Sequence, residues 1–290
     1  MKLILKFNLV FVVVFIAGLV AAGYVSRTLL QQNAREEVAQ NARLVMETAL
    51  STRAYTSNQL RPLLETQMKY TFLPQSVPAY SATEVLNGLR KNFPEYAYKE
   101  ATLNPTNPRN RAADWEADIV HQFRNGAEQA EIVGERDTPA GRSFYIARPI
   151  KITNEACLYC HSTVDAAPKT LIDKYGPANG FGWKLNEVVG AQIVALPIAV
   201  PFARADRAFQ TFMLSLTIVF VVIAIALNLM LYFTVIRPVT RLSALADQVS
   251  LGNLDAPEFT VQRRDEIGVL AESFNRMRKS LVEAMKLLEG

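Results

Sequence analysis

The stretch FMLSLTIVFVVIAIALNLMLYF, residues 212–233, lies within a longer segment, 208–236, that has no charged residue. A second such segment, 7–26, begins near the amino terminus with FNLVFVVVFIAGLVAAG. About 20 apolar residues allow a helix to cross a hydrocarbon core about 30 Å thick. The sequence therefore predicts two membrane helices, 7–26 and 208–236, with one domain, 27–207, between them and another, 237–290, after them.

Basic residues at the ends of these segments predict their orientation. Lys2 and Lys6 precede the first segment and Arg237 and Arg241 follow the second, whereas Arg204 and Arg207 lie on its other side. Basic residues at span ends tend to stay in the cytoplasm. We therefore expect residues 1–6 and 237–290 inside the cell and residues 27–207 in the periplasm, in a protein of the inner (cytoplasmic) membrane. A cleavable signal peptide ending at residues 21–23 is the alternative for the first segment.

The overall composition and charge indicate which classes of partner to expect. Half of the 290 residues are hydrophobic, and the net charge of +4 is spread along the chain. The sequence has no basic stripe interleaved with aromatic residues, which would be typical of nucleic-acid binding. We therefore expect a membrane, and no nucleic acid, among the partners of this chain.

The domain between the membrane helices is expected to be α+β. Residues 27–65 favour a long helix, because Ala, Leu, Gln, Glu and Arg dominate and no Gly or Pro occurs before Pro62. Prolines predict loops with short helices over 72–110, and an amphipathic helix is expected over 113–123. Residues rich in β-favouring types lie between turn signals at 130–134, 144–152 and 188–200. Strands that follow helices in this way indicate an antiparallel sheet.

The stretch CLYCH, residues 157–161, contains both cysteines of the chain and one of its two histidines. Two thiols three positions apart can form thioethers with the two vinyl groups of haem, and the next histidine can then bind the iron. Thioether attachment takes place outside the cytoplasm, where the predicted topology places this stretch. We therefore expect one covalent haem c per chain, held by Cys157, Cys160 and His161.

CLYCH has three other interpretations. A thioredoxin-like dithiol usually opens a helix within a βαβ pattern, and no such pattern surrounds Cys157. A zinc site needs four ligands, and His121 is the one further His or Cys in the sequence. A disulfide between Cys157 and Cys160 would close a very small, strained ring.

The sixth ligand of the iron has three candidates in the same domain: Met46, Met68 and His121. Met46 lies beside the apolar stripe of the 27–65 helix, where methionine commonly fills a core. Met68 lies near a proline-rich break. His121 projects away from the apolar side of the 113–123 helix, which predicts surface exposure. An open, five-coordinate iron is the remaining alternative and would suit a gas ligand.

Two amphipathic segments follow the second membrane helix and Pro238. The first has a short apolar stripe, a polar connector spans 251–264, and DEIG at 265–268 opens the second. The apolar positions of the second segment alternate by three and four residues, which is a heptad seam: Ile267, Leu270, Phe274, Met277, Leu281, Ala284 and Leu288. We expect these helices to pair with a second copy of the chain as a parallel coiled coil, giving a homodimer.

Several stretches resemble a family of extracytoplasmic PAS-like sensor domains that carry a covalent c-type haem. They are RAYTSNQLRPLL, FLPQSVPAY, YKEATLNPTNPRNRAADWE, CLYCH and GFGWKLNEVVGAQIVALP. This resemblance implies thioethers at Cys157 and Cys160 and iron ligation by His161. In that family a distal cysteine on the N-terminal helix can bind the iron. The present chain has no third cysteine, so Met46 on the same helix is the favoured second metal ligand.

Residues 235–290 resemble a HAMP linker, with a proline near the start, two heptad helices and the DEIG turn. The expected function is therefore a membrane-anchored c-type haem sensor that passes a redox or small-gas signal through the second membrane helix to a HAMP coiled coil. The alternative is a membrane-tethered c-type cytochrome for electron transfer, which would need only one span and no cytoplasmic heptads.

An enzyme is not expected. The sequence places no carboxylate pair or second histidine as a proton donor for peroxidase or nitrite-reducing chemistry. The part after residue 236 contains no histidine and no Gly-rich nucleotide loop. We therefore expect a gas ligand or redox partner outside the cell. Inside the cell, we expect a separate kinase or other output protein, or a following output domain.

Overall fold

The computed structural model describes residues 3–126, 129–138, 141–253, 257–259 and 265–289. The helices are α1 (Leu3–Tyr55), α2 (Arg61–Met68), α3 (Pro78–Leu89), α4 (Asp114–Asn125), α5 (Leu158–His161), α6 (Lys169–Tyr175), α7 (Ala199–Leu231), α8 (Arg237–Ser250) and α9 (Glu266–Glu289). The strands are β1 (Ala97–Thr102), β2 (Ile132–Thr138), β3 (Gly141–Lys151) and β4 (Val188–Pro197). The chain divides into two units, Ser26–Phe209 and the segments Met1–Val25 with Gln210–Gly290.

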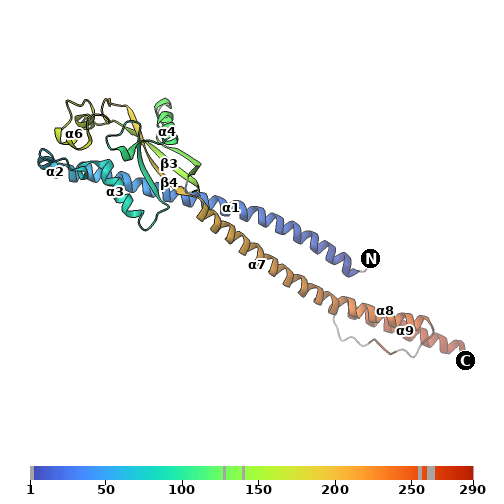
Figure 1. Ribbon diagram of the computed structural model, residues 1–290. Coiled ribbons are helices and arrows are strands. Elements are labelled where there is room, and N and C mark those ends of the chain that lie inside the picture. The colour runs from blue at the N-terminus through green and yellow to red at the C-terminus, as the bar shows by residue number, and fades with distance from the viewer. Residues whose placement is uncertain (1–2, 127–128, 139–140, 254–256, 260–264, 290) are drawn as a thin grey trace. The chain divides into compact units, whose positions relative to one another are not determined.

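The first unit is built on a four-stranded antiparallel sheet in the order β1-β4-β3-β2 (Figure 1). Alternate residues of each strand point to opposite faces. On one face, Val194 and Leu196 of β4 and Ile146 of β3 pack against α1 and α3. On the other face, Ala191 and Ile193 of β4 pack against α4. The prediction of an α+β domain with an antiparallel sheet and a long N-terminal helix is confirmed.

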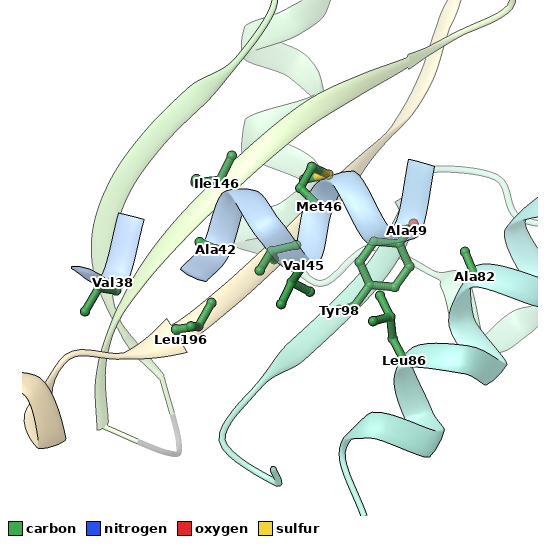
Figure 2. Close-up of a cluster of buried hydrophobic side chains, with 11 residues drawn as sticks. Val38, Ala42, Val45, Met46, Ala49, Ala82, Leu86, Tyr98, Ile146 and Leu196 are labelled. Atoms are coloured by element: carbon green, nitrogen blue, oxygen red, sulfur yellow. The ribbon is translucent and has the colours of Figure 1, made fainter. Parts of the chain in front are cut away.

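The core between α1 and the sheet follows the helical spacing of the sequence (Figure 2). One side of α1 supplies residues of this core that have neighbours three or four positions away, with Val45 and Met46 adjacent: Val38, Ala42, Val45, Met46 and Ala49. Leu86 of α3 and Tyr98 of β1 complete the cluster beside them. Burying this stripe stabilises the upper part of α1 against the sheet, since tertiary packing rather than propensity supplies most helical stability.

Strand β1 lies inside the stretch 72–110 that was predicted to form loops with short helices, so that prediction was wrong here. Its sequence, AYKEAT, is polar, and it is an edge strand paired only with β4. Its charged residues are held by partners elsewhere in the sequence: Lys99 Nζ lies 2.6 Å from Glu116 Oε2, and Glu100 pairs with Arg53. Tertiary ion pairs therefore offset the low β-propensity of this segment.

Two wide helical turns mark the places where helices continue into a proline. A π-helical turn, Thr56–Leu60, joins α1 to α2, and another, Tyr232–Ile236, joins α7 to α8. In each case the next two residues are Arg and Pro, Arg61-Pro62 and Arg237-Pro238. Proline lacks an N–H and its ring clashes with the carbonyl four residues earlier. A π turn lets the helix pass this point without breaking, because the ladder is locally widened.

The second unit contains most of the two charge-free segments, 7–26 and 208–236. They belong to the helical runs Ile4–Met68 and Ala199–Ser250, which are long and apolar enough to cross a membrane, by length and composition. Within this unit, the side chains of Asn8 and Asn228 exchange two amide hydrogen bonds of 2.9 and 2.8 Å. Such reciprocal polar pairs join helices inside a bilayer, where water cannot compete for the amides. The two candidate membrane helices therefore share one polar contact in their apolar surroundings.

The last two helices enclose a small core. Leu242 of α8, Ala271 of α9 and Phe259 of the connector are buried together. Asn275 holds Phe259 through both of its backbone polar groups, at 3.2 and 3.1 Å. The Asp265 carboxylate accepts the Gly268 N–H at 3.0 Å, which caps α9 as the DEIG turn predicts.

One side of α9 is exposed in the described part of the chain. The seam residues Leu270, Met277 and Leu281 are 47, 61 and 44% exposed. Leu270 and Met277 line a mainly apolar groove of about 400 Å³ between α8 and α9. Connector residues 254–256 and 260–264, and the side chain of Leu288, lie outside the described part of the chain.

Candidate functional site

The CLYCH stretch forms a short helical turn after β3 rather than the plain loop that was predicted. A 3₁₀ turn, Glu155–Cys157, leads into α5, Leu158–His161. The side chain of Asn154 starts the turn by accepting the Ala156 N–H at 2.8 Å. Cys157 and Cys160 are free thiols, each half-buried. The turn thus presents two unbridged thiols directly before a histidine.

The ring of His161 is held in one tautomer. Its Nδ1 lies 2.7 Å from the carbonyl oxygen of Gly180. A carbonyl can only accept a hydrogen bond, so Nδ1 carries the proton and the Nε2 lone pair is left for another partner. Burial lowers the pKa of His161, and the hydrogen bond to Gly180 partly offsets this effect. The imidazole is therefore neutral near pH 7, which is the form that binds a metal.

A glycine-rich loop between α6 and β4 packs against the His161 ring. Trp183 stacks on His161 with ring centres 3.9 Å apart and planes 13° from parallel. The Trp183 N–H donates to the His161 carbonyl at 3.1 Å, and the Gly182 N–H donates to Ser162 at 2.8 Å. The loop that was predicted from its glycines and aromatic residues therefore packs directly on the CLYCH turn.

Gly180 is the residue in this loop whose small size is required. Its φ is +90°, and an added Cβ would lie 1.9 Å from Oγ1 of Thr106 and 2.9 Å from Thr106 Cα. The Thr106 hydroxyl is buried and has no hydrogen-bond partner within the described part of the chain. Sequence reasoning missed Thr106, since its only signal was a place in the polar stretch LNPTNPRN. The segment after β1 therefore packs against Gly180, whose carbonyl orients His161.

Charged residues approach the motif from the long helix. Arg53 on α1 forms an ion pair with Glu100, whose side chain is only 3% exposed. Burial is the largest single effect and lowers the pKa of Arg53, but the charges of Glu100, Tyr98 and Cys157 and the hydrogen bond to Glu100 together outweigh it, so the pKa is raised. Burial raises the pKa of the Cys160 thiol, and the charge of Arg61 acts in the opposite direction. The motif thus lies within electrostatic reach of two arginines.

The donor set fits a covalently attached haem. The structure brings together the three residues predicted to hold it, with both sulfurs unbridged and His161 Nε2 free of the hydrogen bond made by Nδ1. The sheet around the motif is antiparallel in its described strands, unlike the βαβ setting of a thioredoxin-like dithiol. No group of three or more His, Cys, Asp or Glu side chains that could hold zinc occurs among the described residues.

The three candidates for a sixth ligand lie in different surroundings. Met46 is fully buried in the core between α1 and the sheet, in a cluster that contains no residue of CLYCH (Figure 2). Met68 is half-buried at the end of α2, and its carbonyl accepts a hydrogen bond from Thr170 of α6 at 3.1 Å. His121 is exposed on α4, opposite the buried Ile119 and Phe123, as its place in the helix predicts.

Comparison with known proteins gives two domain matches and partial relatives. Residues 31–197 match the family described as Tll0287-like, and residues 230–283 match the HAMP domain. A protein named as a sensory transducer in Acetivibrio thermocellus is 34% identical over 28% of this chain and 14% of its own length. The heme sensor protein HssS of Staphylococcus aureus is 36% identical over 25% of this chain and 16% of its own length.

Comparison with solved structures gives a partial match, and the family match covers most of the Ser26–Phe209 unit. The crystal structure of the cyanobacterial heme-protein Tll0287 superposes with a TM-score of 0.44 and 15% identity, covering 56% of this chain and 95% of that one. By contrast, the chain covers only 14% and 16% of the lengths of the two curated relatives named above. Because the Tll0287-like match extends over more than half of its residues, the chain belongs to the Tll0287-like family, and a HAMP domain follows its second apolar helix.

Proposed function

We propose that this chain is a membrane-anchored haem sensor that signals through its HAMP domain. The observation that carries the proposal is the His161 tautomer: Nδ1 is fixed by Gly180 at 2.7 Å, and Nε2 is available beside two free thiols. The proposal is supported by the domain matches, since His161 and both thiols lie within residues 31–197, which match the Tll0287-like family, and the HAMP match covers residues 230–283. The heme sensor and sensory transducer among the partial relatives support the same assignment.

In this proposal Cys157 and Cys160 hold one haem c through thioethers, and His161 binds the iron through Nε2. Bound haem supplies an iron that changes its charge by one unit between two redox states and that can take a small gas on an open side. The Gly180 carbonyl draws on the Nδ1 proton and makes His161 a stronger donor to the iron. Trp183 restricts rotation of the ring. No catalytic step is assigned to the chain.

We propose the same division of the chain as the sequence predicts. Residues 7–26 and 208–236 cross the inner membrane, 1–6 and 237–290 lie in the cytoplasm, and 27–207 form the periplasmic haem domain. Strand β4 runs directly into α7, with only Ile198 between them. A shift of the sheet on a change at the iron can therefore pass along α7 into α8 without an intervening flexible linker.

The output is proposed to be a change in packing of a HAMP homodimer. The exposed seam residues Leu270, Met277 and Leu281 would be covered by a second copy, as a heptad seam requires. A coiled coil with two packings a few kcal/mol apart can be shifted by a modest input. A separate kinase or other output protein, or a following output domain, would then read the packing.

The proposal also includes the sixth ligand of the iron. Met46 stays the ligand predicted from the sequence, and its complete burial gives it a competing role as a core residue. Met68 lies beside α6 and is the alternative thioether, and an open side would suit a gas signal. Loss of the far-red charge-transfer band of ferric Met-ligated haem in Met46→Ala, but not in Met68→Ala, would support Met46.

The experiment that tests signalling is cysteine cross-linking of the haem-loaded chain in membranes. Leu270→Cys places a thiol on the predicted seam, and Val269→Cys places one beside it, where Val269 is 63% exposed. The proposal expects the cross-linking yield of Leu270→Cys to differ between the ferric state, the ferrous state and the ferrous state with carbon monoxide or nitric oxide. Val269→Cys should cross-link weakly in every state. Equal yields for Leu270→Cys in all states would favour the tethered electron carrier instead.

A further inference from the structure

Two arginines, Arg53 and Arg61, lie within electrostatic reach of the CLYCH motif. Arg53 interacts electrostatically with Cys157. Arg61 lies close enough for its charge to act on Cys160 and His161. The two arginines lie on one continuous run of helix, before and after the π turn Thr56–Leu60. The motif therefore faces the part of this helix around the turn, beyond the level of Met46.

Two contacts fix α2 beside the chain segment that follows the motif. Thr170 Oγ1 of α6 donates to the Met68 carbonyl at 3.1 Å. The rings of Phe72 and Tyr175 meet edge to face with centres 5.7 Å apart, and Phe72 is 5% exposed. These contacts hold the end of α2 and the residues after it against α6, which follows CLYCH in the chain.

Arg53 already has a partner for its charge. Its guanidinium pairs with Glu100, and the Tyr98 hydroxyl donates to the other Glu100 oxygen at 2.8 Å. Both carboxylate oxygens are thus engaged by protein groups. A buried ion pair with its hydrogen bonds made has little to gain from another anion. Arg53 is therefore not free to bind a ligand carboxylate.

Arg61 is in the opposite situation. It is half-buried at the start of α2, and within the described part of the chain it has no hydrogen-bond or ion-pair partner. Its planar guanidinium can make two parallel hydrogen bonds to a carboxylate, a geometry that lysine cannot reproduce. Haem carries two propionate side chains, and each carboxylate needs a cation or water when the haem is partly buried.

We propose that Arg61 binds a propionate carboxylate of the haem held at CLYCH, whereas Arg53 is reserved by Glu100. This inference rests on the proposed function, since it names a further residue of the same haem site. Arg61 then has two effects: it fixes the free edge of the haem against α2, and its positive charge favours the ferrous iron. Binding would thereby tie the haem to the helix run that begins in the first apolar segment.

The test uses the full-length, haem-loaded chain and its resonance Raman spectrum and reduction potential. Arg61→Gln should shift the propionate bending mode and lower the reduction potential, because a hydrogen-bonded positive charge is lost near the iron. Arg61→Lys should also shift the mode but keep the potential near that of the wild type, because the charge stays. Lys69→Gln, an exposed position just past the end of the same helix, is the matched control and should change neither mode nor potential.

Two results would overturn the inference. One is an Arg61→Gln variant whose propionate mode and potential match those of Lys69→Gln. The other is a shift of the mode in the double variant Arg53→Gln/Glu100→Gln but not in Arg61→Gln, which would assign the carboxylate to Arg53. A pyridine haemochrome measured first on every sample separates these failures from a failure of the proposed function, because without covalent haem no variant would give the c-type spectrum.

Discussion

His161 and Met46, the two residues predicted to bind one iron from opposite sides, lie in contrasting surroundings. His161 is half-buried, oriented by the Gly180 carbonyl at 2.7 Å and stacked on Trp183. Met46 has no exposed surface and packs in the core between α1 and the sheet. A ligand oriented by a polar loop can bind without rearrangement, whereas a core thioether can bind only if the core opens. A soft side chain on the expected helix is therefore a weaker sign of ligation than an oriented donor.

The largest expected effect comes from Met46→Ala. Removing a fully buried methionine leaves a cavity, and such changes cost about 2–5 kcal/mol of unfolding free energy. Urea unfolding of the haem-loaded chain in detergent measures this loss. Fluorescence can follow it, because both tryptophans, Trp115 and Trp183, lie in the Ser26–Phe209 unit.

Met68→Ala is the matched control for this comparison. Met68 is only half-buried, so its truncation should cost less stability than that of Met46. If Met46 is a core residue alone, neither the ferric nor the ferrous absorption spectrum changes in Met46→Ala. A changed spectrum in Met46→Ala, with the spectrum of Met68→Ala unchanged, would contradict the contrast between His161 and Met46. It would identify Met46 as the iron ligand, as the sequence predicts.

Gly180→Ala should destabilise the loop that orients His161. Both Gly180 and Gly182 have positive φ, +90° and +81°, which costs an alanine about 1–2 kcal/mol. At Gly180 the new methyl group would also meet Thr106, whereas nothing lies within 4 Å at Gly182. Overpacking of this kind costs a further 1–3 kcal/mol, roughly. Gly182→Ala therefore serves as the control for backbone strain.

The iron–histidine stretching mode of the ferrous protein gives a second readout for this pair. We expect it to shift in Gly180→Ala, because displacement of the loop lengthens the hydrogen bond to Nδ1, and to stay in place in Gly182→Ala. Equal stability losses and unchanged modes in both variants would show that the contact with Thr106 does not position the ring.

Trp183→Ala should have a smaller effect. Stacked aromatic pairs contribute about 0.5–1.5 kcal/mol beyond their buried area. We expect Trp183→Ala to be roughly 1 kcal/mol less stable than Trp183→Phe, which keeps a ring against His161, as measured by thermal unfolding with circular dichroism. Equal stabilities of the two variants would mean that the stacking seen with His161 adds nothing to the packing of the loop.

Thr106→Val has the smallest expected effect, and its sign is informative. The Thr106 hydroxyl is buried without a partner in the described part of the chain, and an unsatisfied buried hydroxyl destabilises a fold. Valine keeps the shape and removes the hydroxyl, so stability should stay equal or rise by up to about 1 kcal/mol. A loss of more than about 1 kcal/mol would show that water or the haem satisfies this hydroxyl.

Sequence reasoning predicted the periodic parts of the fold. The apolar segments, the long helix and the heptad helix were expected from patterns that repeat locally, and the four-stranded sheet was expected in part. Strand β1 was missed because AYKEAT is short and polar, and its burial depends on Arg53 and Glu116, which lie far away in the sequence. Phe259 was missed although it is an aromatic residue in a polar connector, which is a usable signal.

The candidate site was likewise predicted from the sequence only in part. Cys157, Cys160 and His161 were predicted because their spacing matches c-type haem attachment and lies within one turn of chain. The residues that orient His161 were not found, because Gly180 and Thr106 meet only in the folded structure. The glycine-rich loop pointed to a planar ligand, but nothing local in the sequence says which of its carbonyls faces the imidazole.

The most direct test of the central claim is the intact mass of the chain purified from a host that attaches c-type haem, together with its pyridine haemochrome. The account predicts a mass increase of one haem per chain, located in the peptide that contains Cys157 and Cys160, with His161 as the axial donor. A chain with the mass of the free polypeptide, two alkylatable thiols at these positions and no c-type haemochrome would contradict it.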